Sequence, residues 1–188
     1  ADIGKEVKII SAISGEIITE KLVGRPKSVN NNLVSDVDND ILKIAVINRY
    51  EKKKIALGFI KNFGLKKGAI ASSVAHDSHN IVVIGCSDEE MARAANMIIK
   101  SKGGLVAWSY DQHKCIPLPI AGLMTNQNGY KIAGDYLLLV ALAKEFGSTL
   151  NDPFMTMGFM SLLVIPKLKL SDKGLFDCEK FQLTELFE

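Results

Sequence analysis

The stretch from Ala69 to Gly85 constrains the fold more than any other part of the sequence. Two apolar, β-prone runs flank five polar residues, His76-Asp77-Ser78-His79-Asn80. The run Ile81–Ile84 consists only of β-branched residues, which is typical of a strand buried on both faces. The stretch therefore predicts two strands joined by a polar connection at a sheet end, where loops on a rigid scaffold commonly carry function.

This polar segment holds two of the three histidines in the chain. Imidazole can bind a metal or move protons near neutral pH, and the neighbouring Asp77 can orient it or raise its pKa. His76 and His79 would share a face in a helix and point to opposite faces in an uninterrupted strand, whereas a turn can bring them together.

Two interpretations of the segment stay open at this stage. In one, Asp77, Ser78 and Asn80 bond to local backbone groups and only shape a turn. In the other, the segment lines a pocket or supports catalysis. Metal ligation is disfavoured, because no further ligands lie nearby in the sequence.

Length and composition set limits on the partners. The 188 residues predict one domain, residues 1–188, with a sizeable core, and 47% hydrophobic residues are typical of a globular chain. The net charge of +2 argues neither for nor against nucleic acid, but the basic run Lys52–Lys54 lacks interleaved aromatic residues. We therefore expect a solvated hairpin tip there and no nucleic-acid partner.

No membrane partner is expected either. The longest apolar run, Tyr136–Ala143, is far too short to cross a bilayer, and no signal peptide is visible at the start. Cys86, Cys115 and Cys178 are odd in number and widely separated, so we expect buried, reduced thiols in a cytoplasmic protein. The missing initiator Met suggests a processed, tagged or excised piece.

Local patterns predict the elements. Runs of β-prone residues indicate three hairpins, at Val7–Ile13 with Glu16–Leu22, Ile41–Asn48 with Ile55–Asn62, and Leu105–Tyr110 with His113–Ile116. Gly24–Asp40 is polar and is expected to be a loop. Lys167–Leu170, Ser171–Gly174 and Phe181–Leu186 predict a strand, a turn and a last strand.

Three helices are expected. The first begins at the N-cap Ser87, with Glu90 completing a capping box, and stops at Gly103-Gly104. The second is amphipathic, from Ile132 to Phe146. Asp152-Pro153 starts a third over Phe154–Leu163, whose methionines and aromatics we assign to the core. The fold class is α+β, a mixed and largely antiparallel β-sheet structure with about three helices packed on it.

Several stretches resemble the C-terminal domain of bacterial and archaeal adenine deaminases, which belong to the amidohydrolase superfamily. The resemblance covers nearly the whole chain in order. It is carried by five stretches: Val74–Asn80, Pro117–Met124, Asp152–Thr156, Ile41–Val46 and Gly174–Asp177.

The resemblance implies an intact enzyme that hydrolyses adenine to hypoxanthine and ammonia in purine salvage and adenine catabolism. It implies manganese or iron in an N-terminal (β/α)8 barrel. This sequence departs from that pattern because the barrel and its His-x-His pair are absent, and three histidines cannot rebuild a two-metal site. Attack at C6 of adenine needs an activated water, which a bound metal supplies. We expect no metal ligands and no cofactor in this chain.

Two hypotheses follow. In the first, the chain packs on the catalytic barrel of an adenine deaminase and helps to line or close its site, with adenine as the substrate. His76, Asp77 and His79 are then candidate catalytic residues, and Ser78 and Asn80 are candidate substrate-binding residues. In the second, the chain is a stand-alone binding or assembly module without catalytic activity. The fragment alone is expected to be inactive, and homo-oligomer formation is left open.

Overall fold

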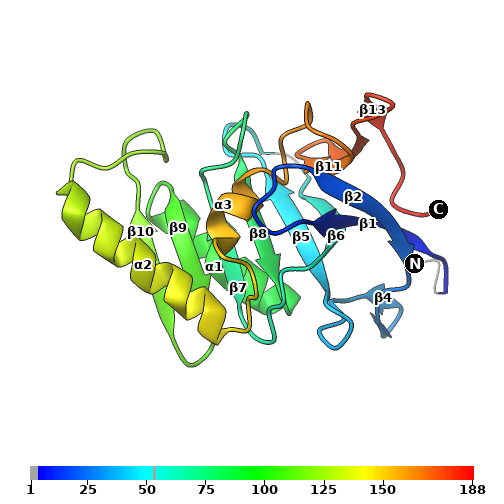
Figure 1. The fold of residues 1–188 in the computed structure, drawn as a ribbon, viewed down its shortest axis with the longest axis horizontal. Helices are drawn as coiled ribbons and strands as arrows, with labels where there is room; N and C mark the ends of the chain where they lie inside the picture. Colours follow the sequence, from blue (N-terminus) through cyan, green and yellow to red (C-terminus); the bar gives the residue numbers. More distant parts are fainter. Residues whose placement is uncertain (1–3, 53) are drawn as a thin grey trace.

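The computed structural model describes residues 4–52 and 54–188. Their main feature is one large sheet that is covered on both faces by other elements (Figure 1). The spatial order of its eight strands is β10 (His113–Pro117), β9 (Gly104–Trp108), β7 (Ala69–Ser72), β8 (Ile81–Gly85), β5 (Ile41–Ile47), β6 (Ala56–Lys61), β1 (Val7–Ala12) and β2 (Thr19–Gly24). Neighbouring strands are antiparallel except β1 and β6, which are parallel. The predicted α+β class is confirmed.

The three predicted hairpins are present. Their registers pair Ala12 with Thr19, Val46 with Ala56, and Trp108 with His113. The hairpin from β5 to β6 contains the lysine run, of which Lys53 lies outside the described residues. The predicted loop Gly24–Asp40 is mostly irregular, but it contains a short ladder of β3 (Ser28–Val29) and β4 (Asn32–Leu33).

Alternate residues of the strands point to opposite faces and build two cores. On one face, α1 (Asp88–Lys100) packs Met91, Ala94 and Ile98 against the small side chains of β5, β7 and β9. On the other face lie α2 (Gly129–Glu145), α3 (Pro153–Gly158) and a second sheet of β11 (Leu168–Ser171), β12 (Gly174–Asp177) and β13 (Gln182–Leu183).

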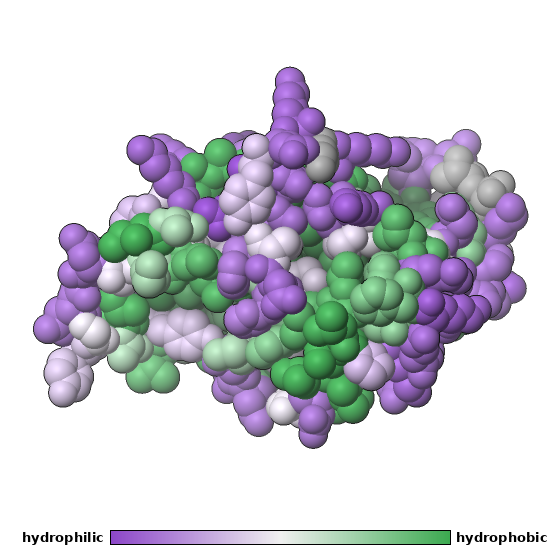
Figure 2. Space-filling model, turned by 90° about the horizontal axis from the view of Figure 1, so that it is seen from above, coloured by the Kyte–Doolittle hydropathy of each residue, from purple (hydrophilic) through white to green (hydrophobic). Residues whose placement is uncertain are grey.

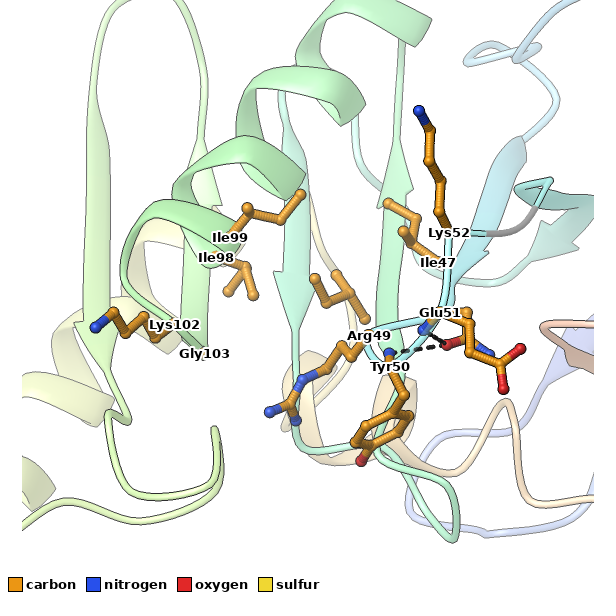
Figure 3. A pocket seen from close by; sticks show the side chains of 11 residues that line it. Ile47, Arg49, Tyr50, Glu51, Lys52, Ile98, Ile99, Lys102 and Gly103 are labelled. Carbon is orange, nitrogen blue, oxygen red and sulfur yellow. Dashed lines mark hydrogen bonds between the residues drawn. The ribbon is translucent and has the colours of Figure 1, made fainter.

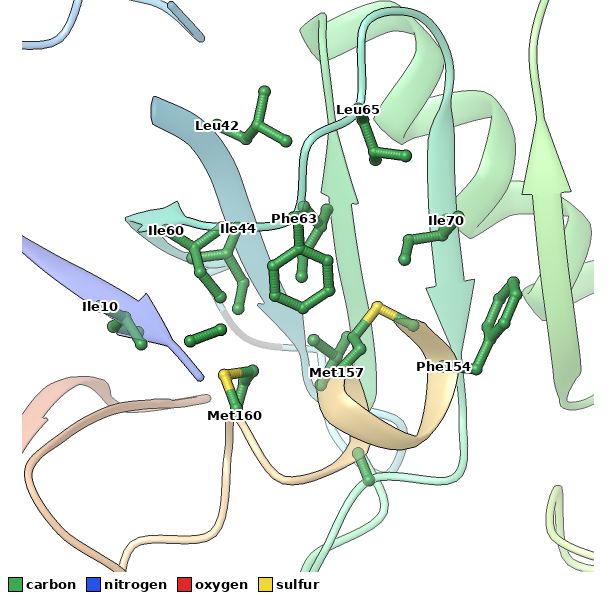
Figure 4. Close-up of a cluster of buried hydrophobic side chains, with 14 of the residues drawn as sticks. Ile10, Leu42, Ile44, Ile60, Phe63, Leu65, Ile70, Phe154, Met157 and Met160 are labelled. Carbon is green, nitrogen blue, oxygen red and sulfur yellow. The ribbon is translucent and has the colours of Figure 1, made fainter. Parts of the chain in front are cut away.

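The larger core confirms most of the assignment of the methionine-rich stretch. Phe154, Met157 and Met160 are buried in the same cluster as Phe63 (Figure 4), whereas Met155 is 55% exposed. The helix itself is shorter than predicted, because α3 ends at Gly158 and the following residues form turns that lead back to β11. The last strand is likewise reduced to β13, two residues long.

The predicted apolar face of the second helix is the one that α2 packs against the core. Leu139 and Ala143 are buried there, and Ile132, Tyr136 and Val140 are partly buried, whereas Leu137 and Leu138 on the opposite side are 70% and 60% exposed. One other expectation needs correction. The three cysteines are free thiols as expected, but they are half-buried rather than buried. No helix of the described residues has the length and apolarity to cross a membrane.

Candidate functional site

The His76–Asn80 segment lies in the connection between β7 and β8, at the upper edge of the sheet in Figure 1. Four other connections reach the same edge: β5–β6, α1–β9, β10–α2 and α3–β11. Figure 2 looks onto this edge and shows a polar centre with apolar side chains to either side. Exposed apolar residues at these loops include Ile120, Met124 and Val164. The edge is therefore a composite surface built by several loops.

Hydrogen bonds tie the histidine segment, and the residues just before it, to two other parts of the chain at this edge. The His76 backbone N–H donates to the Gly158 carbonyl at 2.9 Å, and the Ser161 hydroxyl donates to the His76 carbonyl at 3.1 Å. On the other side, the Ser73 hydroxyl donates to the Gly122 carbonyl at 2.5 Å. Residues far apart in sequence thus fix the segment between the end of α3 and the turn before α2.

The turn brings the two histidines together. Their ring centroids lie 5.6 Å apart in an edge-to-face arrangement, and the His76 ring stacks on Phe159 at 4.8 Å. Both imidazoles are half-buried, whereas Asp77 and Ser78 are exposed. The sequence-derived candidates therefore form one cluster, in which the histidine pair is held by packing and the Asp77 carboxylate lies at the surface.

His79 has an unusual environment. Its Nδ1 is buried and has no hydrogen-bond partner among the described residues. Burial lowers the pKa of His79, with further lowering from His76 and from the positive charge of Arg49, while Asp77 acts in the opposite direction. The ring is therefore neutral at pH 7, with one nitrogen able to donate a hydrogen bond and the other able to accept one.

Ser78 and Asn80 contribute to the shape of the loop. Asn80 is only 2% exposed. Its Oδ1 accepts from the Arg49 backbone N–H at 3.1 Å, and its Nδ2 donates to the Ser78 hydroxyl at 3.1 Å. The Tyr50 hydroxyl donates to the Ser78 carbonyl at 3.0 Å. Asn80 thus bonds to a neighbouring side chain and to the backbone of another loop, and not to local backbone groups as the turn interpretation predicted.

Arg49 and Tyr50 were not singled out from the sequence. They follow β5 directly and look like ordinary polar residues of a hairpin tip that also contains lysines. The only sequence signal is that Asn48-Arg49-Tyr50 interrupts the apolar run before the lysines begin. Their contacts with the histidine segment exist only because β5 and β8 are neighbours in the sheet.

Two hollows adjoin the cluster. The larger, of about 450 Å³, lies between the β5–β6 loop and the end of α1, and Figure 3 shows it lined by Arg49, Tyr50, Ile98, Lys102 and Gly103. The smaller, of about 140 Å³, is apolar and includes His76, Tyr136 and Phe154. The Tyr136 hydroxyl donates to the Asp152 carboxylate at 2.7 Å, and burial raises the pKa of Tyr136.

The described residues do not fit a metal centre. No three His, Cys, Asp or Glu side chains of residues 4–52 and 54–188 lie close enough together to hold an ion. The histidine pair supplies two imidazoles, one of them stacked on a phenylalanine ring. Metal-assisted hydrolysis needs several fixed ligands, and we therefore derive no step through a metal from this chain.

A family model described as the adenine deaminase C-terminal domain matches residues 16–182. The chain belongs to this family. Within it, the chain is 48% identical to the adenine deaminase of Methanosarcina acetivorans, 50% identical to that of Borreliella afzelii and 43% identical to that of Salinibacter ruber. The resemblance noted from the motifs is confirmed.

These similarities cover 97%, 94% and 98% of this chain, respectively, but only 33%, 33% and 34% of the three relatives. The chain thus spans about a third of the length of the curated relatives it matches. The remaining two-thirds of the relatives have no counterpart in it.

Proposed function

We propose that this chain works as the C-terminal domain of an enzyme that hydrolyses adenine to hypoxanthine and ammonia. The observation that carries the proposal is the match of residues 16–182 to the adenine deaminase C-terminal domain. Relatives named adenine deaminase are about three times as long, so a larger catalytic domain accompanies this one in them. That partner, purine salvage and a cytoplasmic location are parts of the same proposal.

In this proposal the work is divided between two domains. The metal, manganese or iron, is held by the N-terminal (β/α)8 barrel of the amidohydrolase superfamily, where it lowers the pKa of a bound water. The present residues 1–188 form one domain that packs on the barrel and supplies binding and positioning groups. Homo-oligomer formation stays a prediction.

The edge carrying His76–Asn80 is the surface that we assign to the catalytic domain. The histidine segment is bonded there to the end of α3, and the residue before it to the turn that precedes α2. The exposed apolar residues Ile120 and Val164 offer contact area around a polar centre. The neutral His79 ring can hydrogen-bond to a purine nitrogen or hold a proton during transfer. Asn80 holds the segment from inside, while Ser78 and Asp77 lie at the exposed rim.

Kinetics of the intact enzyme test this role. If the cluster faces the catalytic site, His76→Gln, Asp77→Asn and His79→Gln lower kcat and kcat/KM together, because a lost transition-state interaction affects both. Thermal unfolding should change little. His113→Gln is the matched control, since His113 is exposed at the start of β10 and belongs to another part of the sheet.

Near-normal kinetics for all three variants, with unchanged metal content, would show that the segment is purely structural and would refute the site assignment.

The alternative, a stand-alone binding or assembly module, is tested by sequencing the gene that encodes this domain. Barrel motifs encoded upstream in the same reading frame support the proposed enzyme, and an isolated gene for this domain alone supports the module.

A further inference from the structure

We infer that Arg49 is the positioning residue for the His76–His79 pair, an inference that rests on the proposed function of that pair. Arg49 leaves the end of β5 and reaches two other loops. Its Nη1 donates to the His79 carbonyl at 3.0 Å, and its Nη2 donates to the Ala121 carbonyl at 2.7 Å. One side chain thereby ties the histidine segment to the turn that precedes α2.

The backbone of Arg49 strengthens the same link. Its N–H donates to the Asn80 side chain at 3.1 Å, so Arg49 holds the segment on both sides of the junction between His79 and Asn80. The following residue, Tyr50, donates from its hydroxyl to the Ser78 carbonyl at 3.0 Å. The segment is therefore fixed at three successive residues by the tip of one neighbouring hairpin.

The turn opposite is shaped to receive the guanidinium. Gly122 has a φ of +73°, and a Cβ at this position would overlap with the Nη2 of Arg49. A residue with a side chain would therefore displace Arg49 from the turn. Figure 3 shows the Arg49 side chain pointing toward Gly103 and away from Glu51 and Lys52 of its own loop.

An arginine is required by this geometry. Two carbonyl oxygens, on separate segments, accept from the two ends of one planar group, and a guanidinium presents such donors in a fixed fork. A lysine ammonium is a point charge on a flexible stem and cannot hold both carbonyls in the same way. Arg49→Lys therefore keeps the charge and loses the fork.

The charge has a separate effect on the histidine. His76 and Arg49 both lower the pKa of His79, beyond the larger effect of burial, and Asp77 raises it. Removing the Arg49 charge should raise the pKa of His79, since one opposing positive charge is lost. A residue that only fastened loops at a distance would leave the titration of His79 unchanged.

NMR of the 188-residue chain tests the inference. We would follow the His79 ring through a pH titration and measure the nuclear Overhauser effect between the two imidazole rings in the wild type, Arg49→Gln, Arg49→Lys and Lys52→Gln. Lys52→Gln is the control, because it removes the same charge from the same loop, at a side chain that points elsewhere (Figure 3). We expect Arg49→Gln alone to raise the pKa of His79, and both Arg49 variants to weaken the ring-to-ring signal.

Equal His79 titrations in Arg49→Gln and Lys52→Gln, with the fold intact, would overturn the inference. If Arg49→Gln does not fold, the test rests on Arg49→Lys. A nuclear Overhauser effect between the two imidazole rings that is as strong in Arg49→Lys as in the wild type then refutes the positioning role. In an adenine deaminase that contains this domain, Arg49→Lys should lower kcat on the order of tenfold or more at similar KM. Unchanged kinetics despite the NMR changes would leave Arg49 as the positioning residue and refute the proposed catalytic role of the pair.

Discussion

Lys169 is a buried lysine whose amine has little contact with water. The residue is fully buried in β11, and its Nζ donates to the Ile17 carbonyl at 2.7 Å. Burial lowers the pKa of Lys169 to about 8, against a partial opposing effect from Cys178. A cation in this position is destabilising compared with the same group in water.

This burial predicts a pH dependence of stability. Because the folded-state pKa lies below the ordinary value of 10.5, the unfolded chain binds more protons between about pH 8 and 10.5, and the contribution of Lys169 to the free energy of unfolding rises over that range. Below pH 8, where Lys169 is charged in both states, its burial lowers the free energy of unfolding by about 3 kcal/mol. Lys169→Met should remove this slope in urea unfolding measured at several pH values. A wild-type-minus-variant difference that is constant with pH would contradict it.

At the scale of single elements, the start of α1 is held by a capping network that also reaches the sheet. The Glu90 backbone N–H donates to the Ser87 hydroxyl at 3.2 Å, and that hydroxyl donates to the Glu90 carboxylate at 2.8 Å. The same carboxylate accepts from the buried Gly68 N–H at 2.8 Å. The predicted capping box is thus present in a modified form, with Gly68 as the additional partner.

We predict that Ser87→Ala lowers the free energy of unfolding by about 1 kcal/mol, the usual effect of losing an N-cap side chain. Glu90→Ala should cost more, about 1–3 kcal/mol, because it also leaves the buried Gly68 N–H without its partner. Ser14→Ala, at an exposed turn, serves as the control. Equal effects of Glu90→Ala and Ser87→Ala in urea unfolding would show that the bond to Gly68 adds nothing.

The whole molecule has the features of an independently folding unit. Its sheet is covered on both faces, by α1 on one and by α2, α3 and β11–β13 on the other. We predict a single cooperative urea transition for the 188-residue chain, with coincident curves by circular dichroism and fluorescence. Broad unfolding without a folded baseline would show that the chain does not fold independently and needs a further domain, such as the proposed catalytic one.

The isolated chain is also predicted to release little or no ammonia from adenine and to bind no stoichiometric transition metal. The reason is chemical: the water that attacks C6 needs an activating metal, and the described residues offer no cluster of three ligands. Elemental analysis and an ammonia assay on the purified chain check this. About two tightly bound ions per chain together with deamination would overturn the division of labour between the domains.

The sequence by itself determined the elements whose signals are local. The β-branched run Ile81–Ile84 forms all but the last residue of β8. Ser87 is the N-cap of α1, and Asp152 is the N-cap of α3, as their local patterns predict. Strand alternation, capping and turn chemistry depend on neighbours within a few residues, so they can be recognised without the fold. The family resemblance, which the comparisons confirmed, was likewise carried by short stretches of sequence, one of which begins at Asp152.

Only the tertiary structure decided the strand order and the completion of the site. β1 pairs in parallel with β6, and Arg49 meets His79 across 30 residues of sequence. The partner groups are backbone carbonyls, which every residue possesses, so no sequence pattern marks the one that Arg49 will bind. The physical reason is that sheet pairing brings distant loop tips to one edge, and side chains that look equivalent in the sequence, such as Arg49 and Lys52, become different only there.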